Sequence, residues 1–520
     1  MWPGAASNPR RAPTPTIRGV QLAVIDLGSN SFRLVVFSAT GDRWKRTDEI
    51  HEAVRIGEGL AATGELGEEP MQRALSTLDV FAHFCRAAGI AVDDVDAVAT
   101  SAIRDASNAD AFLARARKRT GLAIRVLSRE EEAHYGYLAA VNSTTLSDGC
   151  VLDMGGGSMQ LVQVAERRAV ASGSWRLGAV RTTERFLPGD EPATKKQMDK
   201  LRAHTTAKLA RAPWLAECGP RLVGIGGTVR NLANAAQRAA GLPSLGVQGQ
   251  LISAAALDEL IGRLAELPPA DRAKIAGVKP ARADLILGGA VVIAATMQAG
   301  GFDALEATEA GLREGVFFAR HLGAEDGLFD DVRRQSVLNL AGRYALAAAH
   351  TDHVARLALG LFDETAAAGL HAGDPREREL LWAACALHDI GMSVDYDDHH
   401  KHSRYLILSA GLPGFTPTEL ALIAQAARYH RKGTPDPGPL AELLTSKGDL
   451  GRLDRMAVLL RLAEDLERSR DQSVREAHVS VNGRTATLAL VSEEDTALPR
   501  WAARREVDLF ARAFGRTLDV

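Results

Sequence analysis

The sequence predicts two similar α/β lobes, an all-helical domain after them, and a small α+β segment at the C-terminal end. Up to about residue 320, short apolar strands alternate with amphipathic helices, which is the pattern of an α/β fold. A strand, an aspartate, a turn of small residues and a second strand occur twice, in 21–38 and 150–164, which indicates a duplication. Farther along, the chain has helical patterns, and eight of its fourteen histidines fall between His350 and His430.

The composition is that of a globular protein, and it argues against several function classes. The 520 residues are 46% hydrophobic and 24% charged with a net charge of −3, so we expect neither nucleic-acid binding nor stable membrane association. The four cysteines lie far apart and form no CxxC pair, which predicts a reducing, cytoplasmic setting without a disulfide framework. Residues 1–18 hold prolines and arginines without an apolar core, which predicts a disordered tail rather than a signal peptide.

The first repeated unit has two apolar runs, Leu22–Ile25 and Leu34–Phe37, which predict strands on either side of a tight turn. Gly28 permits the turn, and the following residues offer N–H and hydroxyl donors to an anion: Ser29, Asn30 and Ser31. Asp26, at the end of the first strand, can bind a divalent cation. A plain hairpin explains the same residues, because Asn, Gly and Ser all favour turns.

The elements that follow continue the alternation. Apolar residues at helical spacing between Met71 and Ala88 predict an amphipathic helix that ends at Gly89. Beyond it the pattern predicts, in order, a strand at 95–100, a helix from Ser107 or Asn108 to Gly121, a strand at 123–127 and a helix from Ser128 through Ala140.

The second repeated unit places Asp153 after an apolar strand and before a turn of Gly155, Gly156, Gly157 and Ser158. A third glycine turn, Gly224–Thr228, joins a strand to a helix that begins near Val229. Its residues Gly226, Gly227 and Thr228 can direct backbone N–H groups at an anion. Three such turns with two matching aspartates indicate a duplicated domain whose halves face each other, and they strengthen the evidence that the turns bind an anion.

The C-terminal third changes character. Residues 321–331 have the composition of a linker, 332–467 are helical in pattern, and the tail from Val474 has short alternating segments. We therefore predict these divisions: a disordered tail 1–18, a first lobe 19–142, a second lobe 143–320, a helical domain 328–472 and a small appendage 473–520.

The motifs together resemble a known family. They are DLGSNS at 26–31, TSAIRD at 100–105, EEEA at 130–133, DMGGGS at 153–158, GIGGT at 224–228 and GLREGV at 311–316. In order and spacing they are similar to the exopolyphosphatase / guanosine pentaphosphate phosphatase family, and RYHRK at 428–432 extends the resemblance toward residue 470. The resemblance implies two ribonuclease-H-like lobes around a phosphate cleft, as in actin, sugar kinases and the heat-shock chaperone ATPases.

The resemblance also implies site residues. Glu132 falls on the catalytic glutamate and would act as the base, whereas the capping box of Ser128 and Glu131 accounts for acidic residues here without catalysis. Asp26 and Asp153 would hold Mg²⁺, with Mn²⁺ or K⁺ as alternative ions. The three small-residue turns would donate hydrogen bonds to phosphate, and Arg33 and Arg104 would neutralise its charge.

One position departs from the family pattern. Gln160 stands where the family usually has a glutamate, and an amide serves neither as a base nor as a charged metal ligand. We expect an exopolyphosphatase that releases orthophosphate from inorganic polyphosphate. The alternatives are a guanosine pentaphosphate (pppGpp) phosphohydrolase of the same chemistry, a polyphosphate or alarmone sensor that has lost turnover, and a kinase-like phosphotransferase.

The histidine-rich region resembles HD-type metal phosphohydrolases in its order of His353, His388-Asp389, His400, His402 and His430. In the closing segment, Glu464 occupies the place of the usual aspartate and Asp465 follows it. The alternatives are a second metal site of His353, His388, Asp389, Glu464 and Asp465, or histidines that line a polar groove. A nearby basic patch predicts contact with polyphosphate: Lys401, Arg404, Arg428, Arg431 and Lys432. The resemblance also implies that the chain forms a homodimer.

Overall fold

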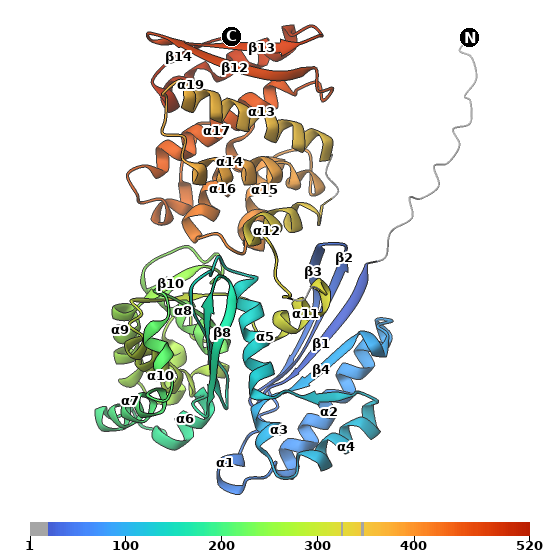
Figure 1. Cartoon of the computed structure of the whole chain (residues 1–520), viewed down its shortest axis with the longest axis vertical. Helices are drawn as coiled ribbons and strands as arrows, with labels where there is room; N and C mark the ends of the chain where they lie inside the picture. Colours follow the sequence, from blue (N-terminus) through green and yellow to red (C-terminus); the bar gives the residue numbers. More distant parts are fainter. Residues whose placement is uncertain (1–18, 324–325, 345–347) are drawn as a thin grey trace, which may run out of the picture.

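The computed structural model describes residues 19–323, 326–344 and 348–520. Two α/β lobes lie side by side, and a helical region with a small sheet is stacked on one end of them (Figure 1). The predicted disordered tail, 1–18, lies outside the described residues. The duplicated α/β architecture followed by helices and a small sheet confirms the fold class that the sequence predicts.

The first lobe is built on a five-stranded sheet in the order β3-β2-β1-β4-β5. The predicted hairpin is present, with β1 antiparallel to β2 and Asp26 directly opposite Arg33. The strands are β1 (Val20–Leu27), β2 (Phe32–Thr40), β3 (Arg43–Glu52), β4 (Val95–Ala99) and β5 (Ile124–Val126). The sequence did not predict β3, because it is a polar edge strand whose side chains are mostly exposed and lack apolar alternation.

Helices cover this sheet. Buried apolar side chains of α2 and α4, among them Leu78, Phe81 and Phe112, pack into one core with Ile25 and Leu34 of the sheet. The helices are α1 (Leu60–Thr63), α2 (Glu68–Ala87), α3 (Ser101–Asp105) and α4 (Ala109–Thr120).

The second lobe repeats the plan around a six-stranded sheet in the order β10-β11-β9-β6-β7-β8. Its hairpin places Asp153 of β6 directly opposite Gln160 of β7. The strands are β6 (Gly149–Met154), β7 (Met159–Ala165), β8 (Arg168–Trp175), β9 (Arg221–Ile225), β10 (Gln250–Ser253) and β11 (Ala304–Ala307). The helices are α6 (Ala179–Phe186), α7 (Lys195–Leu209), α8 (Gly227–Ala239), α9 (Ala254–Ala265) and α10 (Ile286–Gly300).

Two helices, α5 (Arg129–Val141) and α11 (Leu312–Leu322), cross between the lobes. A Cβ on Gly315 of α11 would lie 1.8 Å from the backbone oxygen of Tyr135 in α5, so the two backbones touch. Residues of α5 pack on the second sheet, whereas α11 packs on the first, where Phe317 stacks on Phe37 with ring centroids 4.3 Å apart. The predicted divisions 19–142 and 143–320 therefore assign each crossing helix to the lobe whose sheet it does not cover.

Beyond α11 the chain forms a helical region. Its helices are α12 (Val332–Ala341), α13 (Ala348–Ala367), α14 (Pro375–Leu387), α15 (His399–Ala410), α16 (Pro417–Tyr429) and α17 (Asp449–Leu466). The C-terminal elements are β12 (Val474–Asn482), β13 (Thr485–Ser492), α18 (Ala497–Ala503), α19 (Val507–Phe514) and β14 (Thr517–Asp519). Leu488 and Phe510 of these elements share one hydrophobic core with Leu460 of α17, so the small sheet packs as part of the helical region.

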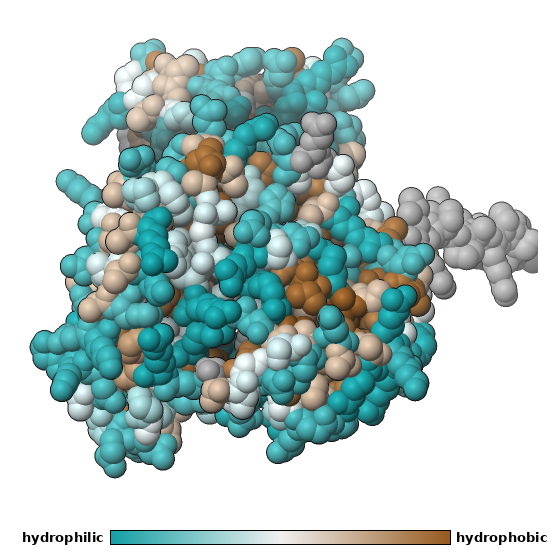
Figure 2. Space-filling model, turned by 60° about the horizontal axis from the view of Figure 1, so that its bottom comes forward, coloured by the Kyte–Doolittle hydropathy of each residue, from teal (hydrophilic) through white to brown (hydrophobic). Residues whose placement is uncertain are grey.

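The surface is mainly hydrophilic and the thiols are unpaired. Hydrophilic residues dominate the face shown in Figure 2, and apolar residues form small groups on it rather than one broad patch. Among the described residues no helix combines the length and the apolar character needed to cross a bilayer. All four cysteines are free.

Candidate active site

A cleft of about 120 Å³ lies where the two hairpin turns face each other. Both repeated units contribute to its walls, together with the start of α5, the turn before α8 and the start of α11. Most of the residues predicted for the site line it: Asp26, Ser29, Asn30, Ser31, Arg33, Glu132, Asp153, Gly155, Gly156, Ser158, Gly226 and Gly227.

Small residues are needed where the turns approach each other. A Cβ on Gly157 would lie 2.5 Å from Ser101 Oγ and 3.1 Å from Ser29 Oγ, so a larger residue would push the lobes apart. Ser29 Oγ and Ser101 Oγ are themselves 3.1 Å apart, within hydrogen-bond distance. Gly157 thus serves the approach of the two lobes and does not line the main cleft.

Glu132 enters the cleft from the first turn of α5, and its carboxylate is held from two sides. Arg104 Nη1 donates a 2.7 Å hydrogen bond to Oε2, and Ser158 Oγ donates a 3.3 Å hydrogen bond to Oε1. Burial raises the pKa of Glu132, and the Arg104 guanidinium acts in the opposite direction. The predicted capping box of Ser128 and Glu131 is present as well, so the cap engages Glu131 and leaves Glu132 free to face the cleft.

The two aspartates of the repeated units are also largely shielded from water. Burial raises the pKa of Asp26, which Arg313 opposes from 3.6 Å. Burial, followed by the negative charges of Glu132 and Asp26, raises the pKa of Asp153 to about 7. Oxygen ligands with this mutual repulsion suit a hard divalent cation, because a bound cation would stabilise their ionised forms. The residues present therefore fit the metal that the sequence predicts.

Three arginines of the cleft were missed by the sequence reasoning. They are Arg230 of α8, Arg282 at the end of the short helical turn Pro280–Arg282, and Arg313 of α11. Burial, and then Arg313 and Arg230, lower the pKa of Arg33 to about 10, which shows how closely these cations gather. Arg313 lies inside the GLREGV motif, which carried a signal, whereas nothing in the sequence around Arg282 points to a phosphate.

Two predicted phosphate ligands have other contacts. Arg104 stands behind Glu132, where it also donates a 2.9 Å hydrogen bond to the backbone oxygen of Leu127. Thr228 is buried at the start of α8, against Gly289. The structure thus corrects the prediction for both, because neither residue lines the cleft.

Gln160 is buried beside the cleft and does not line it. Its Nε2 donates hydrogen bonds to Ser158 Oγ at 2.9 Å and to Ser174 Oγ at 3.3 Å. Because Ser158 in turn donates to Glu132, the glutamine positions the hydroxyl that contacts the glutamate. Its side chain completes a hydrogen-bonded chain that runs from β8 to Glu132.

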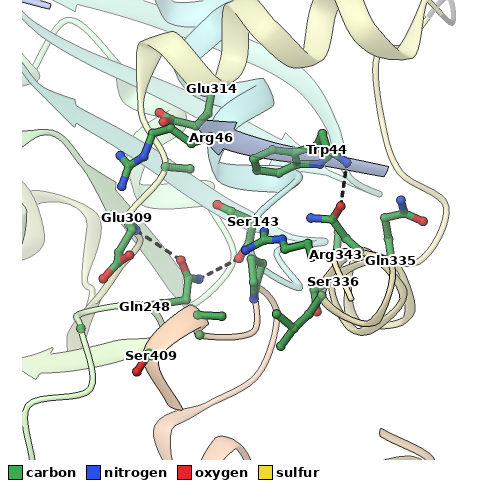
Figure 3. A pocket seen from close by; sticks show the side chains of 18 of the residues that line it. Trp44, Arg46, Ser143, Gln248, Glu309, Glu314, Gln335, Ser336, Arg343 and Ser409 are labelled. Atoms are coloured by element: carbon green, nitrogen blue, oxygen red, sulfur yellow. Dashed lines mark hydrogen bonds between the residues drawn. The ribbon is translucent and has the colours of Figure 1, made fainter. Parts of the chain in front are cut away.

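A second, larger cavity of about 820 Å³ separates the lobes from the helical region (Figure 3). Arg46, Arg343 and Arg404 line it together with Trp44. The start of α11 lies between the cavity and the cleft, because Glu314 lines the cavity while the preceding residue, Arg313, lines the cleft.

Arg404 is therefore one member of the predicted basic patch that faces a cavity. The others are disposed around the same end of α15 and α16: Lys401 contacts Asp398, Arg431 lies over the Tyr396 ring, and Arg428 lies over the Tyr429 ring. Lys432 adds to the positive potential that lowers the pKa of His400, a smaller effect than burial and Arg428.

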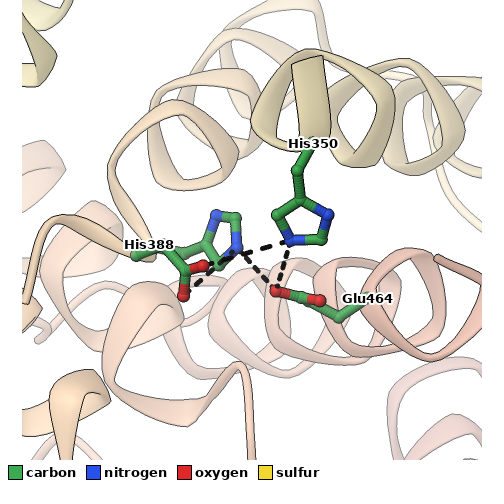
Figure 4. Close-up of side chains that lie close together, drawn as sticks. His350, His388 and Glu464 are labelled. Carbon is green, nitrogen blue, oxygen red and sulfur yellow. Dashed lines mark hydrogen bonds and ion pairs between the residues drawn. The ribbon is translucent and has the colours of Figure 1, made fainter. Parts of the chain in front are cut away.

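The predicted second metal site is assembled in part. His388, Asp389 and Glu464 lie together, and His350 completes the group in place of His353 (Figure 4). His353 is one helical turn farther along α13, where its Nε2 contacts the backbone oxygen of Val474. Asp465 also lies outside the group, because consecutive residues of α17 point in different directions. Both histidines precede His388 at similar distances in the sequence, so the sequence alone did not show that His350 rather than His353 belongs to the group.

Comparisons with known proteins agree with this geometry. Residues 35–323 match the model of the Ppx/GppA phosphatase family, and residues 332–504 match that of Ppx/GppA phosphatase domain III. A crystal structure of the Aquifex aeolicus Ppx/GppA family member is 28% identical, with a TM-score of 0.51, and the match covers 58% of this chain and 98% of that chain. An exopolyphosphatase from Cytophaga hutchinsonii is 24% identical, with a TM-score of 0.54 and coverage of 59% and 99%.

The first family model spans more than half of the chain and includes the second hairpin turn, Glu132, Arg230, Arg282 and Arg313, whereas the first hairpin turn and Arg33 precede the matched residues. With the cleft, its buried carboxylates and its arginines in place, the protein belongs to the Ppx/GppA phosphatase family.

Proposed function

We propose that the protein is a Mg²⁺-dependent exopolyphosphatase that removes terminal phosphates from inorganic polyphosphate. The observation that carries the proposal is the placement of Glu132, a buried carboxylate held by Arg104 and Ser158 in a cleft whose other walls are phosphate-binding turns and arginines. Such a site combines a base with charge neutralisation, which are the two requirements of phosphoanhydride hydrolysis.

Glu132 takes the proton of the attacking water. The water oxygen bonds to the terminal phosphorus, the bond from phosphorus to the bridging oxygen breaks, and the shortened polyphosphate leaves as an anion. Burial raises the pKa of Glu132 and so makes the carboxylate a stronger base. Ser158 uses one of the two lone pairs of Oε1, so this oxygen retains a lone pair for the water.

The negative charge of the substrate would be neutralised by the arginines and by a bound cation. Arg33, Arg230, Arg282 and Arg313 surround the cleft, and their guanidinium groups can form paired hydrogen bonds with phosphate oxygens. Asp26 and Asp153 would hold Mg²⁺, which supplies further positive charge to the phosphate oxygens when bound. Ser29, Asn30 and Ser31 and the backbone of the second turn donate hydrogen bonds.

The large cavity is compatible with either of two substrates. A long polyphosphate can extend from the cleft toward Arg46, Arg343 and Arg404, which would favour processive removal. The same space, with the Trp44 ring in its wall, favours the second candidate, pppGpp 5′-phosphohydrolysis, because about 820 Å³ can accommodate a nucleoside. A third candidate is a sensor that binds polyphosphate or pppGpp but does not hydrolyse it.

Phosphate release from long-chain polyphosphate and from pppGpp, with Mg²⁺ and with Mg²⁺ replaced by Mn²⁺, tests the proposal. We expect release from polyphosphate with wild type and a large loss with Glu132→Gln. Release from pppGpp alone would favour the second candidate. Tight binding of either anion without release at any cation concentration would contradict the enzyme and support the sensor. Size-exclusion chromatography with light scattering of the same samples tests the predicted homodimer.

A further inference from the structure

We propose that the helical region holds two divalent transition-metal ions bridged by Asp389. This site is separate from the hydrolytic cleft and does not depend on the proposed function. Two groups of side chains that can ligate a metal meet at this aspartate. One group is His350, His388, Asp389 and Glu464, and the other is Asp389, His399 and His430.

The first group surrounds a small volume between α13, α14 and α17. Glu464 Oε1 lies 2.7 Å from His388 Nε2 and 3.3 Å from His350 Nε2, and Asp389 Oδ2 lies 4.0 Å from His350 Nε2. Figure 4 shows the His350 and His388 rings pointing at the same carboxylate oxygen. A metal ion among these atoms would convert a cluster of short contacts into coordination bonds.

The second group uses the other oxygen of the aspartate. Asp389 Oδ1 lies 3.3 Å from His399 Nε2 and 3.7 Å from His430 Nε2. The two ring nitrogens are themselves 3.1 Å apart. Oδ1 also lies 3.6 Å from His388 Nε2 of the first group, so it stands between the two groups while Oδ2 faces His350. Asp389 can therefore bridge two ions, as carboxylates do in two-metal sites.

The imidazoles of three of these histidines are oriented as metal ligands are. The Nδ1 atoms of His388, His399 and His430 lie 2.6, 2.8 and 2.7 Å from the backbone oxygens of Cys385, Tyr396 and Ala427. A carbonyl oxygen only accepts hydrogen bonds, so each Nδ1 carries a proton, and in the neutral ring each Nε2 presents a lone pair that can ligate a metal. Without a metal, a second ring proton on His388 Nε2 bridges the 2.7 Å to Glu464 Oε1, in the place that the cation would take. Histidine ligands of metals are oriented by outer hydrogen bonds of this kind.

The lone pairs of His399 and His430 would repel each other across 3.1 Å in the neutral rings. A cation between them and Asp389 removes the repulsion. On the opposite side, His350 Nδ1 faces Glu467 Oε1 at 3.9 Å, and both atoms are buried without a hydrogen-bond partner among the described residues. The ligand set of four imidazoles and two carboxylates favours Mn²⁺, Fe²⁺, Co²⁺ or Zn²⁺ over Mg²⁺.

The side of the cluster toward solvent is closed by an arginine. Arg470 Nη2 lies 3.1 Å from Asp389 Oδ2, and the Arg470 side chain is 48% exposed. The positive guanidinium balances the negative charge of Asp389. The Arg470 side chain would leave this position when the cations bind. The exposed position of Arg470 gives ions a way in without unfolding of the buried helices.

The test compares metal content of the full-length chain and its variants. Each protein is stripped with a chelator, loaded with excess Mn²⁺ in the presence of excess Mg²⁺ to occupy the oxygen ligands of the hydrolytic cleft, desalted and measured by mass spectrometry. We expect Asp389→Ala to bind two fewer Mn²⁺ ions than wild type, and His430→Gln one fewer. His402→Gln, on the same helix as His399 but outside both groups, is the control and should match wild type.

Wild-type protein should also show the electron paramagnetic resonance spectrum of two coupled Mn²⁺ ions, which His430→Gln should convert to that of an isolated ion. The spectrum keeps the proposal falsifiable if Asp389→Ala does not fold. Equal Mn²⁺ content in wild type and a folded Asp389→Ala variant, a loss of one ion in that variant, or uncoupled spectra from wild type would each overturn the bridged site. None of these results depends on phosphatase activity, so failure here is distinct from failure of the proposed function.

Discussion

Arg104 and Glu132 form a buried ion pair of 2.7 Å that joins α3 to the first turn of α5. The guanidinium fixes one oxygen of the carboxylate and leaves the other facing the cleft and Ser158. The pair connects two motifs, TSAIRD and EEEA, through residues that are 28 positions apart in the chain. Its geometry leads to the first two predictions.

Glu132→Gln should lower the rate of phosphate release by about 10²–10⁴-fold, because an amide cannot accept the proton of the attacking water. The measurement is the initial rate of orthophosphate release at saturating substrate. The control is Glu131→Gln: this neighbour completes the helix cap, and its variant should keep the wild-type rate. Equal losses in both variants would assign the effect to α5 rather than to the base.

Arg104→Gln should move the acidic limb of the kcat/KM profile to higher pH. Glu132 must be ionised to act as the base, and burial already holds its pKa above the ordinary value of 4.5. Arg104 is the largest influence that lowers this pKa, so its removal raises the pKa further and requires a higher pH for ionisation. The profile is measured at saturating Mg²⁺. An unchanged limb with a lower plateau would contradict the pairing and indicate a purely structural role for Arg104.

Asp153 should make the protein less stable as pH rises in the absence of divalent cations. Its pKa is about 7 in the folded protein against 3.8 ordinarily, so between these values the folded state holds a proton that the unfolded state has released. Stability from this group is therefore lost as pH rises through that interval. Thermal midpoints measured from pH 4 to 8 should fall less in Asp153→Asn, or when Mg²⁺ is added. The same decline in Asp153→Asn as in wild type would exclude this carboxyl as the cause.

Gln160→Glu should destabilise the protein without Mg²⁺ by about 1–3 kcal/mol, because it replaces a buried donor to two serines with a buried carboxylate. Addition of Mg²⁺ should raise the thermal midpoint of the variant more than that of wild type. Thermal unfolding with and without the cation measures both. Wild-type stability in the variant would show that the hydrogen-bonded chain from Ser174 to Glu132 contributes little.

Arg230→Gln should raise KM for polyphosphate about tenfold or more, since a hydrogen bond to a charged group contributes about 1.5–3 kcal/mol. It should also weaken the dependence of KM on salt concentration. Arg238→Gln, near the other end of α8 and exposed, serves as the control and should leave both quantities unchanged. A change in kcat alone would contradict a role of Arg230 in binding.

The sequence predicted the features that repeat or that follow local rules. Asp26 and Asp153 end apolar strands of two similar hairpins, and the resemblance of the EEEA motif identified Glu132 beside the capping box, so all three were predicted before the fold was known. Arg230 and Arg282 were not, and Arg313 was missed although it lies in the GLREGV motif, because each comes from a different helical segment and only the folded chain brings them together. Arginine at a helix start is ordinarily a surface residue, and no local pattern separates the two cases.

Long-range packing explains the other differences. The edge strands β3 and β8 carry mostly polar, partly exposed side chains, so apolar alternation did not predict them. The choice of His350 over His353 depends on how α13 is rotated against α14 and α17, which is set by the hydrophobic core rather than by the order of histidines. The exchange of α5 and α11 between the lobes likewise depends on which sheet each apolar face covers.

The backbone contact between Gly315 and Tyr135 has a mechanical consequence. Because Gly315 has no side chain, the backbones of α5 and α11 meet at this point, and a rotation of one helix against the other would pivot about it. Each helix is anchored to a different sheet, so such a turn would change the width of the cleft while the crossing point stays fixed. A side chain at position 315 would force the two helices apart, so the glycine also fixes how closely the two lobes approach.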